Sequence, residues 1–482
     1  MICDQLLYAG RKVSHSLVNT LNRHLGVTIS KQEQKSFIDM TFGEDFTQDQ
    51  IKYAGEDVAN LPELYTTLEK LLKERDMLEL MDLEMETIHA TCDLELNGIY
   101  LDSEKWLALK ETAEKEAIIA KQELDKHFIE HCEVDMFGNC TVNYNSPIQL
   151  KPLLQRITGV ELPSTNVQVL KRIKHDVITA LLSYREHTKK VTTYGEDFLN
   201  THVSKVTGRV HSNFIQLGAD SGRYASRNPN MTNIPADSRY RAAFEVQSED
   251  YEMISADFSG QELRLLAHLS QEKGFLDALE KGTDLHTNSA SLIFGIAYED
   301  VNKEQRTAAK GLTFGLIYGI GPKKLSENLE ISYDEARNLM DKYYRTFPQI
   351  KTLLDQFVVK ARQSHMAISP LDKRQRDLTT FDWYNRREVA HALNITKNLP
   401  FQGAGASVTK KALCLIRKEL KNSNFDAKIV NVIHDEIVVE ANKNCSKQVS
   451  KIVQDKMIEA FNYFAPSVPM EVNPQISKCW VH

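Results

Sequence analysis

Apolar and polar positions recur with two different periods along this chain, which predicts both helices and strands. Residues 101–128 are rich in Ala, Lys, Glu and Leu and are predicted to form one long helix, and the chain from there to about residue 200 is mostly helical. Helical spacing returns between 257 and 350. Two β-branched runs within 425–442 predict a hairpin. We therefore expect an α+β protein that is mostly helical.

Two acidic motifs stand at the ends of predicted strands. An apolar run ends at Asp257, and Leu263, Leu266 and Ala267 then follow at helical spacing, so Asp257 is expected where a strand gives way to a helix. The hairpin within 425–442 carries the triplet 434–436, His-Asp-Glu, at its tip. Each motif alone is typical of a solvated acidic turn. Together they can bring two aspartates to one place.

Four side chains between these motifs are spaced four residues apart. Arg306, Lys310, Phe314 and Tyr318 would form one ridge on a helix, with two cations followed by two aromatic rings. A nucleoside triphosphate presents its parts in the same order, because its polyanionic tail needs Arg or Lys and its base needs a stacking partner. The structural alternative is an amphipathic helix with cations at its rim and aromatics in a core.

Paired aspartates require a cation if both are to remain charged. Mg²⁺ accepts hard oxygen ligands and shares phosphate oxygens, so a site with two Mg²⁺ ions is the expected partner of Asp257 and Asp435. Two such ions, about 4 Å apart, activate a 3′-hydroxyl and stabilise departing pyrophosphate in an in-line displacement. The ridge and the two acidic motifs therefore favour nucleotidyl transfer over their separate structural explanations.

The three motifs, in this order and spacing, resemble motifs A, B and C of the family A DNA polymerases. The resemblance covers roughly residues 75–482. It implies a right-hand fold with an antiparallel palm sheet, a helical thumb and helical fingers. The expected domains are an exonuclease remnant with an RNase H-like fold (1–75), palm entry and thumb (76–205), palm (206–260), fingers with connecting segments (261–400) and C-terminal palm (401–482). The implied activity is primer extension by template-directed addition of deoxynucleotides, in replication or repair.

The resemblance also implies roles for individual residues. Asp257 and Asp435 would bind metal together with the Phe258 carbonyl, and Glu436 would be an auxiliary acid. The residues implied for the incoming nucleotide are Arg306, Lys310 (also the candidate acid for pyrophosphate), Phe314, Tyr318, His286 and Glu262, which would exclude a ribose 2′-hydroxyl. The residues implied for primer-template DNA are Arg223, Asn230, Asn233, Asn398, Gln402 and His434.

Some positions depart from the family pattern. Gly260 and Gln261 stand where bacterial relatives usually have Gln-Ile, and Asn394 replaces an Arg that contacts the template in many relatives. Phe314 lacks a hydroxyl, which in this family accompanies discrimination against dideoxynucleotides. The departures in the first acidic motif favour a phage-like member of the family.

The first 75 residues resemble part of a proofreading nuclease. Tyr53 and Asp57 have the Tyr-x-x-x-Asp spacing of its last motif, but no Asp-x-Glu precedes them. Such a nuclease needs further acids to carry two metals. We therefore expect no proofreading by this chain alone, and either a separate exonuclease subunit or a truncated start would explain the pattern.

Composition adds several limits. The 482 residues carry a net charge of −7, so DNA binding requires a local cationic cleft. No apolar run approaches the length of a membrane span, and the seven cysteines include no CxxC pair. We expect a cytoplasmic protein (host cytoplasm if viral), with no membrane association, that acts as a monomer and can use a processivity factor.

Two other functions compete with the favoured one. A single-subunit RNA polymerase shares the palm, an acid pair and a cationic fingers helix, but Glu262 favours deoxynucleotides. A non-enzymatic DNA clamp would be expected to lose one metal-binding acid, whereas Asp257 and Asp435 are both present.

Overall fold

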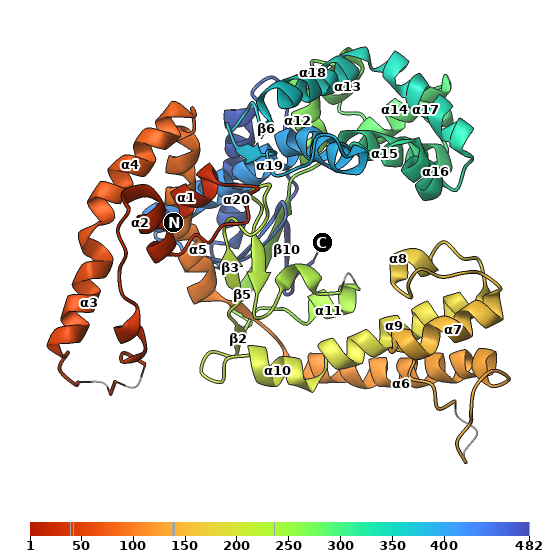
Figure 1. The fold of residues 1–482 in the computed structure, drawn as a ribbon, viewed down its shortest axis with the longest axis horizontal. Helices are drawn as coiled ribbons and strands as arrows, with labels where there is room; N and C mark the ends of the chain where they lie inside the picture. Colours follow the sequence, from red (N-terminus) through yellow and green to blue (C-terminus); the bar gives the residue numbers. More distant parts are fainter. Residues whose placement is uncertain (39, 42, 137–139, 236, 482) are drawn as a thin grey trace. The chain divides into compact units, whose positions relative to one another are not determined.

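A computed structural model describes residues 1–38, 40–41, 43–136, 140–235 and 237–481. The chain forms two compact units. The first contains residues 1–97, 213–232 and 250–476, and the second contains 98–212, 233–249 and 477–482. The described elements confirm a mostly helical α+β chain (Figure 1).

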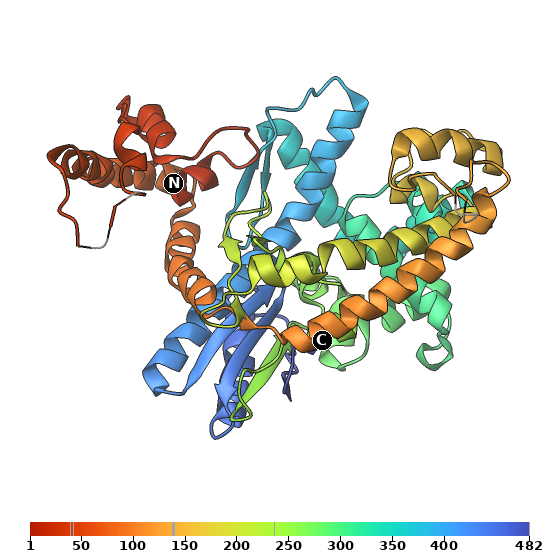
Figure 2. The same ribbon diagram turned by 90° about the horizontal axis from the view of Figure 1, so that it is seen from below.

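The first unit is built on an antiparallel sheet in the order β10-β5-β9-β8. Its strands are β5 (Tyr251–Asp257), β8 (Ala427–Ile433), β9 (Glu436–Asn442) and β10 (Gln475–Ser477). The hairpin predicted within 425–442 is thus confirmed, and Figure 2 shows its two blue strands next to the green strand β5. The register of β8 against β9 shifts between Ile429 and Asn431, as in a β-bulge.

Three long helices pack together around this sheet. They are α5 (Leu78–Asn97), α19 (Arg386–Ser423) and α20 (Ser446–Phe464). α19 packs on both α5 and α20, while α5 also packs on β8 and α20 on β5. Nearly every residue of the middle of α19 is buried, because neighbours cover it on several sides.

A buried ionic cluster joins α5 and α19 to the side chain of Arg374. Glu84 accepts hydrogen bonds from Lys410 at 2.7 and 2.8 Å and from Arg374 at 2.8 Å. All three side chains are at most 3% exposed. Burial lowers the pKa of Lys410 to about 8, and Glu84 opposes that shift. These contacts satisfy charges that would otherwise be costly inside the protein.

The region 257–350 is mostly helical, as predicted. Its helices are α12 (Gln261–Ser270), α13 (Lys273–Glu280), α14 (Leu285–Phe294), η3 (Tyr298–Asp300), α15 (Lys303–Ile317), α16 (Pro322–Leu329), α17 (Tyr333–Thr346) and α18 (Pro348–Ser364). α15 packs against α14 and α16, and α12 packs against α18 and α19 (Figure 1). The hairpin β6 (Met366–Ile368) and β7 (Gln375–Asp377) follows. Further short elements are β3 (Asn213–Ile215), β4 (Ala225–Arg227) and η2 (Met231–Asn233), whose last residue belongs to the second unit.

The elements formed by the described N-terminal residues are all helices. They are α1 (Ile2–Leu7), α2 (Leu17–Leu25), η1 (Gln32–Lys35), α3 (Gln48–Ala59) and α4 (Leu61–Glu74). The carboxylate of Asp4, fully buried, accepts hydrogen bonds from Arg23, at 2.7 Å to one oxygen, and approaches ring nitrogens of His15 and His24 at 2.6 and 2.8 Å. These contacts tie α1 to α2 and lower the pKa of Asp4, although burial alone would raise it.

The second unit is centred on a pair of long helices. α6 (Ser103–Phe128) confirms the helix predicted over 101–128, and it packs along α9 (Asp176–Thr193) (Figures 1 and 2). The other elements are β1 (Ile99–Tyr100), α7 (Pro147–Thr158), α8 (Val167–Leu170), α10 (Glu196–His202), β2 (Arg209–Val210) and α11 (Ser238–Ala242). Trp106, which is fully buried, packs against Phe198 with ring centroids 4.8 Å apart.

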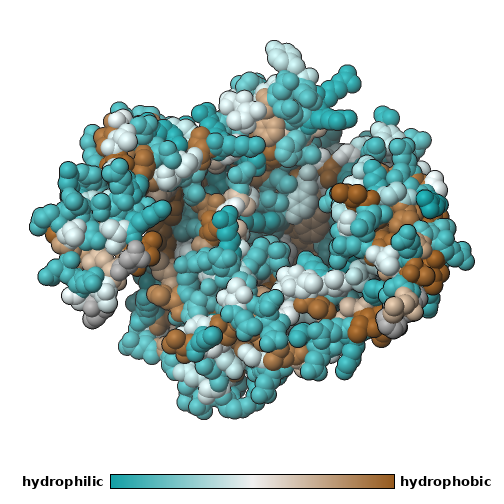
Figure 3. Space-filling model, turned by 60° about the horizontal axis from the view of Figure 1, so that its bottom comes forward, coloured by the Kyte–Doolittle hydropathy of each residue, from teal (hydrophilic) through white to brown (hydrophobic). Residues whose placement is uncertain are grey.

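On the face drawn in Figure 3, polar side chains predominate and apolar ones form separate groups between them. No helix among the described residues is both long and apolar enough to cross a membrane. All seven cysteines are free thiols.

Candidate functional site

The two acidic motifs meet at one end of the sheet. Asp257, the last residue of β5, is paired directly with Glu436, the first residue of β9. Asp435 precedes Glu436 in the two-residue turn of the β8–β9 hairpin. His434, the other residue of that turn, has φ of 55°, a left-handed conformation that a tight hairpin requires and that non-glycine residues seldom adopt. The structure thus brings Asp257, Asp435 and Glu436 together, as the sequence predicted.

The electrostatics of this carboxylate group fit a bound cation. Burial, together with the charges of Asp435 and Glu436, raises the pKa of Asp257 to about 7. Oδ1 of Asp257 is buried and has no hydrogen-bond partner among the described residues. An orphaned buried oxygen next to other carboxylates is unfavourable unless a positive charge neutralises it. Oxygen-only donors of this kind suit a hard divalent ion.

The acids alone do not make up a complete coordination shell. The described residues contain no group of three or more His, Cys, Asp or Glu side chains arranged to hold a metal ion. Any ion here would therefore need further oxygen ligands, such as main-chain carbonyls, water or substrate phosphate. Phe258, whose carbonyl the sequence suggested as one such ligand, has a side chain that is 1% exposed and forms an isolated bridge with Val472.

The predicted ridge of Arg306, Lys310, Phe314 and Tyr318, called the row from here on, lies on α15. Asn302 caps the helix and forms a capping box with Gln305, which fixes where the helix begins. Arg306, Lys310 and Phe314 lie within the helix, and Tyr318 is its C-terminal cap. Lys310 is exposed. The rings of Phe314 and Tyr318 are stacked with centroids 6.1 Å apart, so the row holds its cationic and aromatic halves in the expected order.

Arg306 is held by an acid that the sequence-based assignment did not include. Its Nε and Nη2 donate to the two carboxylate oxygens of Asp284 at 2.9 and 3.0 Å. Asp284 also caps α14 by accepting from the amide of Thr287 at 2.8 Å. Burial would raise the pKa of Asp284, but Arg306 and Thr287 outweigh it and lower the pKa to about 2. Asp284 therefore remains an anion that fixes the direction of the guanidinium.

His286 lies beside the aromatic half of the row. Its ring centroid is 5.7 Å from that of Phe314. Burial lowers the pKa of His286 to about 4, with the charges of Arg306 and Lys310 acting in the same direction and Asp284 opposing them. The imidazole is consequently neutral at physiological pH and can donate one hydrogen bond and accept another.

Glu262 connects the first acidic motif to the row. It lies in the first turn of α12, five residues after Asp257, and accepts a 2.8 Å hydrogen bond from the Tyr318 hydroxyl. Its other oxygen pairs with the guanidinium of Arg223. Burial and Glu262 both raise the pKa of Tyr318, so the phenol stays protonated as the donor. This contact places the aromatic end of α15 on the helix that follows Asp257.

The residues assigned to DNA contact are distributed more widely. Gln402, on α19, lies close enough to the Tyr318 hydroxyl to act on its pKa, which it lowers, whereas Oδ1 of Asn398 is buried without a partner among the described residues. Asn230 is exposed and accepts from the hydroxyl of Thr232 at 2.7 Å. Asn233 belongs to the second unit, where its carbonyl accepts from Tyr194. Arg223 pairs with Glu262, Gln402 acts on Tyr318, and His434 precedes Asp435 in the hairpin turn.

The chain is similar in sequence to known DNA polymerases. A model of DNA polymerase family A matches residues 111–482. DNA polymerase I of Caldicellulosiruptor bescii is 34% identical over 70% of this chain and 41% of its own length. DNA polymerase I of Aquifex aeolicus is 30% identical over 100% of this chain and 83% of its own length. The chain thus spans less than half of the first relative and most of the second.

A solved structure with the same fold is also known. It is described as the POL domain of Pol1 from M. smegmatis in complex with DNA primer-template and dNTP. The TM-score is 0.85 at 26% identity, and the match covers 99% of this chain and 81% of that one. This likeness confirms the polymerase fold that was predicted from the sequence.

Proposed function

Because the chain belongs to DNA polymerase family A, we propose that it is a template-directed DNA polymerase that adds deoxynucleotides to the 3′ end of a primer. The observation that carries the proposal is the pairing of Asp257 with Glu436 next to Asp435, which puts the acids of two distant motifs at one end of a sheet. Family members use divalent metal ions for this reaction, and we propose Mg²⁺ here, bound by Asp257 and Asp435 with the Phe258 carbonyl as a further ligand.

When bound, two such ions would lower the pKa of the primer hydroxyl and neutralise charge on the phosphates. The chain's own residues would bind and orient the nucleotide. Arg306, held by Asp284, would donate to the triphosphate with the guanidinium N–H groups that remain, and Lys310 would donate a proton to the leaving pyrophosphate. The 3′ oxygen forms a bond to the α-phosphorus while the bond from that phosphorus to the bridging oxygen of pyrophosphate breaks.

The aromatic half of the row would receive the sugar and base. Phe314 would pack on the incoming nucleotide, with the neutral ring of His286 beside it. Glu262 would exclude a ribose 2′-hydroxyl, since Tyr318 and Arg223 fix the position of its carboxylate. The primer-template would contact Arg223, Asn230, Asn233, Asn398, Gln402 and His434. The domain limits expected from the sequence, including a thumb within 76–205, belong to the same proposal.

Primer extension decides whether the chain is an enzyme. With a primed template, dNTPs and Mg²⁺, the wild-type protein is expected to extend the primer. Asp435→Ala is expected to lose about a hundred- to a thousandfold in rate, the order of the effect when a charge-stabilising group is removed. The matched control is Asp455→Ala, an exposed acid on α20. Equal activity of wild type and Asp435→Ala, or no activity in either, would overturn the proposal.

The sugar preference separates a DNA polymerase from an RNA polymerase. Wild type is expected to prefer dNTPs over rNTPs on the same template, and Glu262→Ala to reduce that preference. If wild type extends primers equally well with rNTPs, the assignment of Glu262 and of the deoxynucleotide substrate is wrong.

A further inference from the structure

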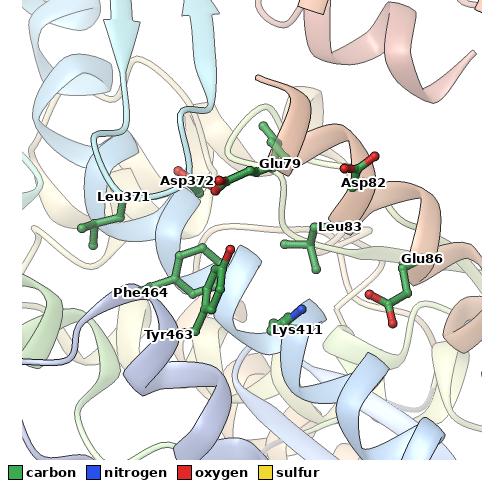
Figure 4. Close-up of a pocket in the computed structure, with 10 residues that line it drawn as sticks. Glu79, Asp82, Leu83, Glu86, Leu371, Asp372, Lys411, Tyr463 and Phe464 are labelled. Atoms are coloured by element: carbon green, nitrogen blue, oxygen red, sulfur yellow. The ribbon is translucent and has the colours of Figure 1, made fainter. Parts of the chain in front are cut away.

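A small pocket lies in the first unit, lined by residues that the proposed reaction does not use. Its volume is about 170 Å³. Figure 4 shows residues of α5 along one side, Tyr463 and Phe464 of α20 on the other, and Lys411 of α19 below them. Leu371 and Asp372, from the loop between β6 and β7, complete the lining. Drug-sized ligands need pockets of roughly 300–1,000 Å³, so this one has room for a single side-chain head group.

The α5 side of the pocket is acidic. Glu79, Asp82 and Glu86 occupy positions i, i+3 and i+7, which lie on one face of a helix, and all three are exposed. Within the described part of the chain, none of the three has a cationic side chain within 4.0 Å. Lys411 is the single cationic side chain among the described residues that line the pocket. The pocket therefore presents a surplus of negative charge to solvent.

A second, independent feature is the carboxylate of Asp372. Its side chain is 1% exposed. One oxygen, Oδ2, accepts from Ser407 at 2.6 Å and from Nε of Arg374 at 3.3 Å. The other oxygen, Oδ1, is buried and has no hydrogen-bond partner among the described residues. A buried carboxylate oxygen without a donor is costly, so a hydrogen-bond donor that reached Oδ1 through the pocket would stabilise it.

The opposite wall offers an aromatic face. Tyr463 is 59% exposed although it is a large ring, and the ammonium of Lys411 lies 5.3 Å from its centroid. The ring is therefore already placed where a cation is attracted to its π electrons. Leu80, Leu83 and Phe464 are each less than 10% exposed and give the pocket an apolar floor. Acids, an aromatic ring and an apolar floor together match the chemistry of a guanidinium on its aliphatic stem.

We propose that this pocket binds an arginine side chain from a basic segment of a partner protein. The guanidinium would donate to Oδ1 of Asp372 and to Glu79, both of which line the pocket, and would stack on Tyr463. Arginine is favoured over lysine because its planar fork can donate to two carboxylates while its face stacks on a ring. The pocket would thus anchor an accessory protein on the polymerase, and this inference does not depend on the proposed catalytic roles.

Fluorescence anisotropy with a defined peptide tests the proposal. The probe is a fluorescein-labelled, amidated peptide with two arginines separated by Gly-Ser spacers, and its analogues carry lysine or citrulline in place of arginine. We expect saturable binding of the arginine peptide, at least threefold weaker binding of the lysine peptide and none of the citrulline peptide. Binding of all three alike, or of none, would overturn the proposal.

Two variants of the protein locate the binding. Asp82→Lys is expected to weaken the arginine peptide at least tenfold, whereas the matched control Asp341→Lys, an exposed acid on α17, changes affinity less than twofold. Lys411→Met is expected to tighten binding at least twofold, because it removes the competing cation at Tyr463. Both pocket variants should retain the circular dichroism spectrum and the unfolding midpoint of wild type, which shows that they fold. Equal loss in Asp82→Lys and Asp341→Lys would mean unspecific attraction to an acidic protein and would refute the site.

Discussion

At the scale of single residues, two side chains of the row on α15 are held in place by acids from other parts of the first unit. Asp284 fixes Arg306 through both carboxylate oxygens, and Tyr318 donates to Glu262. A side chain that is already fixed loses less rotamer entropy when it binds a phosphate. Asp284 is therefore a positioning residue in the proposed reaction, although it is itself negatively charged.

Loss of Asp284 is expected to affect nucleotide binding more than turnover. Asp284→Ala should raise KM for dNTPs about 2- to 10-fold, since freeing a long side chain costs about 0.5–1.5 kcal/mol on binding. kcat should change less than twofold in steady-state primer extension. Asp284→Asn, which retains an acceptor for Thr287, is the matched variant. Its KM should lie between those of wild type and Asp284→Ala. A lower KM in Asp284→Ala would mean that the acid competes with the triphosphate instead of helping Arg306.

Phe314 gives a prediction about sugar recognition. Phe314→Tyr is expected to increase incorporation of dideoxynucleotides relative to dNTPs by about tenfold or more. The reason is that the hydroxyl added by tyrosine could form a hydrogen bond to a charged group, which is worth roughly 1.5–3 kcal/mol. Competition between ddNTP and dNTP on one template measures the ratio, and Phe314→Leu controls for loss of the native ring. If wild type incorporates dideoxynucleotides as readily as Phe314→Tyr, the prediction is wrong.

His286 makes the stability of the protein depend on pH. The pKa of this base is lowered to about 4, so between that value and its ordinary pKa the unfolded chain binds more protons than the folded one. Stability from this residue is present above the ordinary value near 6.5 and is lost as pH falls toward 4. After allowance for solvent exposure, we expect wild type to lose about 1 kcal/mol more than His286→Gln between pH 7 and pH 5 in urea unfolding. Parallel losses in the two proteins would contradict this.

At the scale of elements, the ionic cluster of Glu84, Arg374 and Lys410 fastens α19 to α5 and to the loop between β6 and β7. Lys410→Met should destabilise the first unit by about 3–5 kcal/mol, because it removes one of the two cations that neutralise the buried carboxylate of Glu84. The double variant Glu84→Gln with Lys410→Met should recover part of that loss. Chemical unfolding measures both, and a single-variant change below about 1 kcal/mol would show that the cluster contributes little.

The elements also show what the sequence can predict. The strand ending at Asp257, the hairpin around Asp435 and the helix bearing Arg306 were predictable, because each depends on local periodicity and turn residues. The pairs Asp284–Arg306 and Glu84–Lys410 were not, since they join residues 22 and 326 positions apart that no local pattern relates. The orphaned oxygen of Asp372 was equally hidden, because burial depends on the packed fold.

At the scale of the whole molecule, the N-terminal helices bear on proofreading. The ammonium of Lys31 donates to both oxygens of Asp57, at 2.9 and 3.0 Å, and to the hydroxyl of Tyr53 at 3.0 Å. Lys31 thus donates hydrogen bonds to both polar side chains of the segment that resembles a nuclease motif. Because the cation is supplied by the protein, this arrangement favours a structural role for Asp57 over metal binding.

If Asp57 is structural, the chain should not degrade a mismatched primer. The purified chain should leave a 3′ mismatch intact in the absence of dNTPs, and Asp57→Ala should behave the same while unfolding at slightly lower denaturant concentration. The change in stability should stay within about 1 kcal/mol, since the ion pair is partly exposed. Removal of the mismatch by wild type and its loss in Asp57→Ala would show an active exonuclease instead.

The shifted register between β8 and β9 has a consequence for how this chain can vary. Side chains alternate between the two faces of a strand, so adding or deleting one residue between the bulge near Ile429 and the turn at His434 would rotate Asp435 to the opposite face. Conservative replacements along this segment change the packing alone, whereas a change of length would separate Asp435 from Asp257. We expect the amino acid identities in this segment to vary among related polymerases, and its number of residues to stay the same.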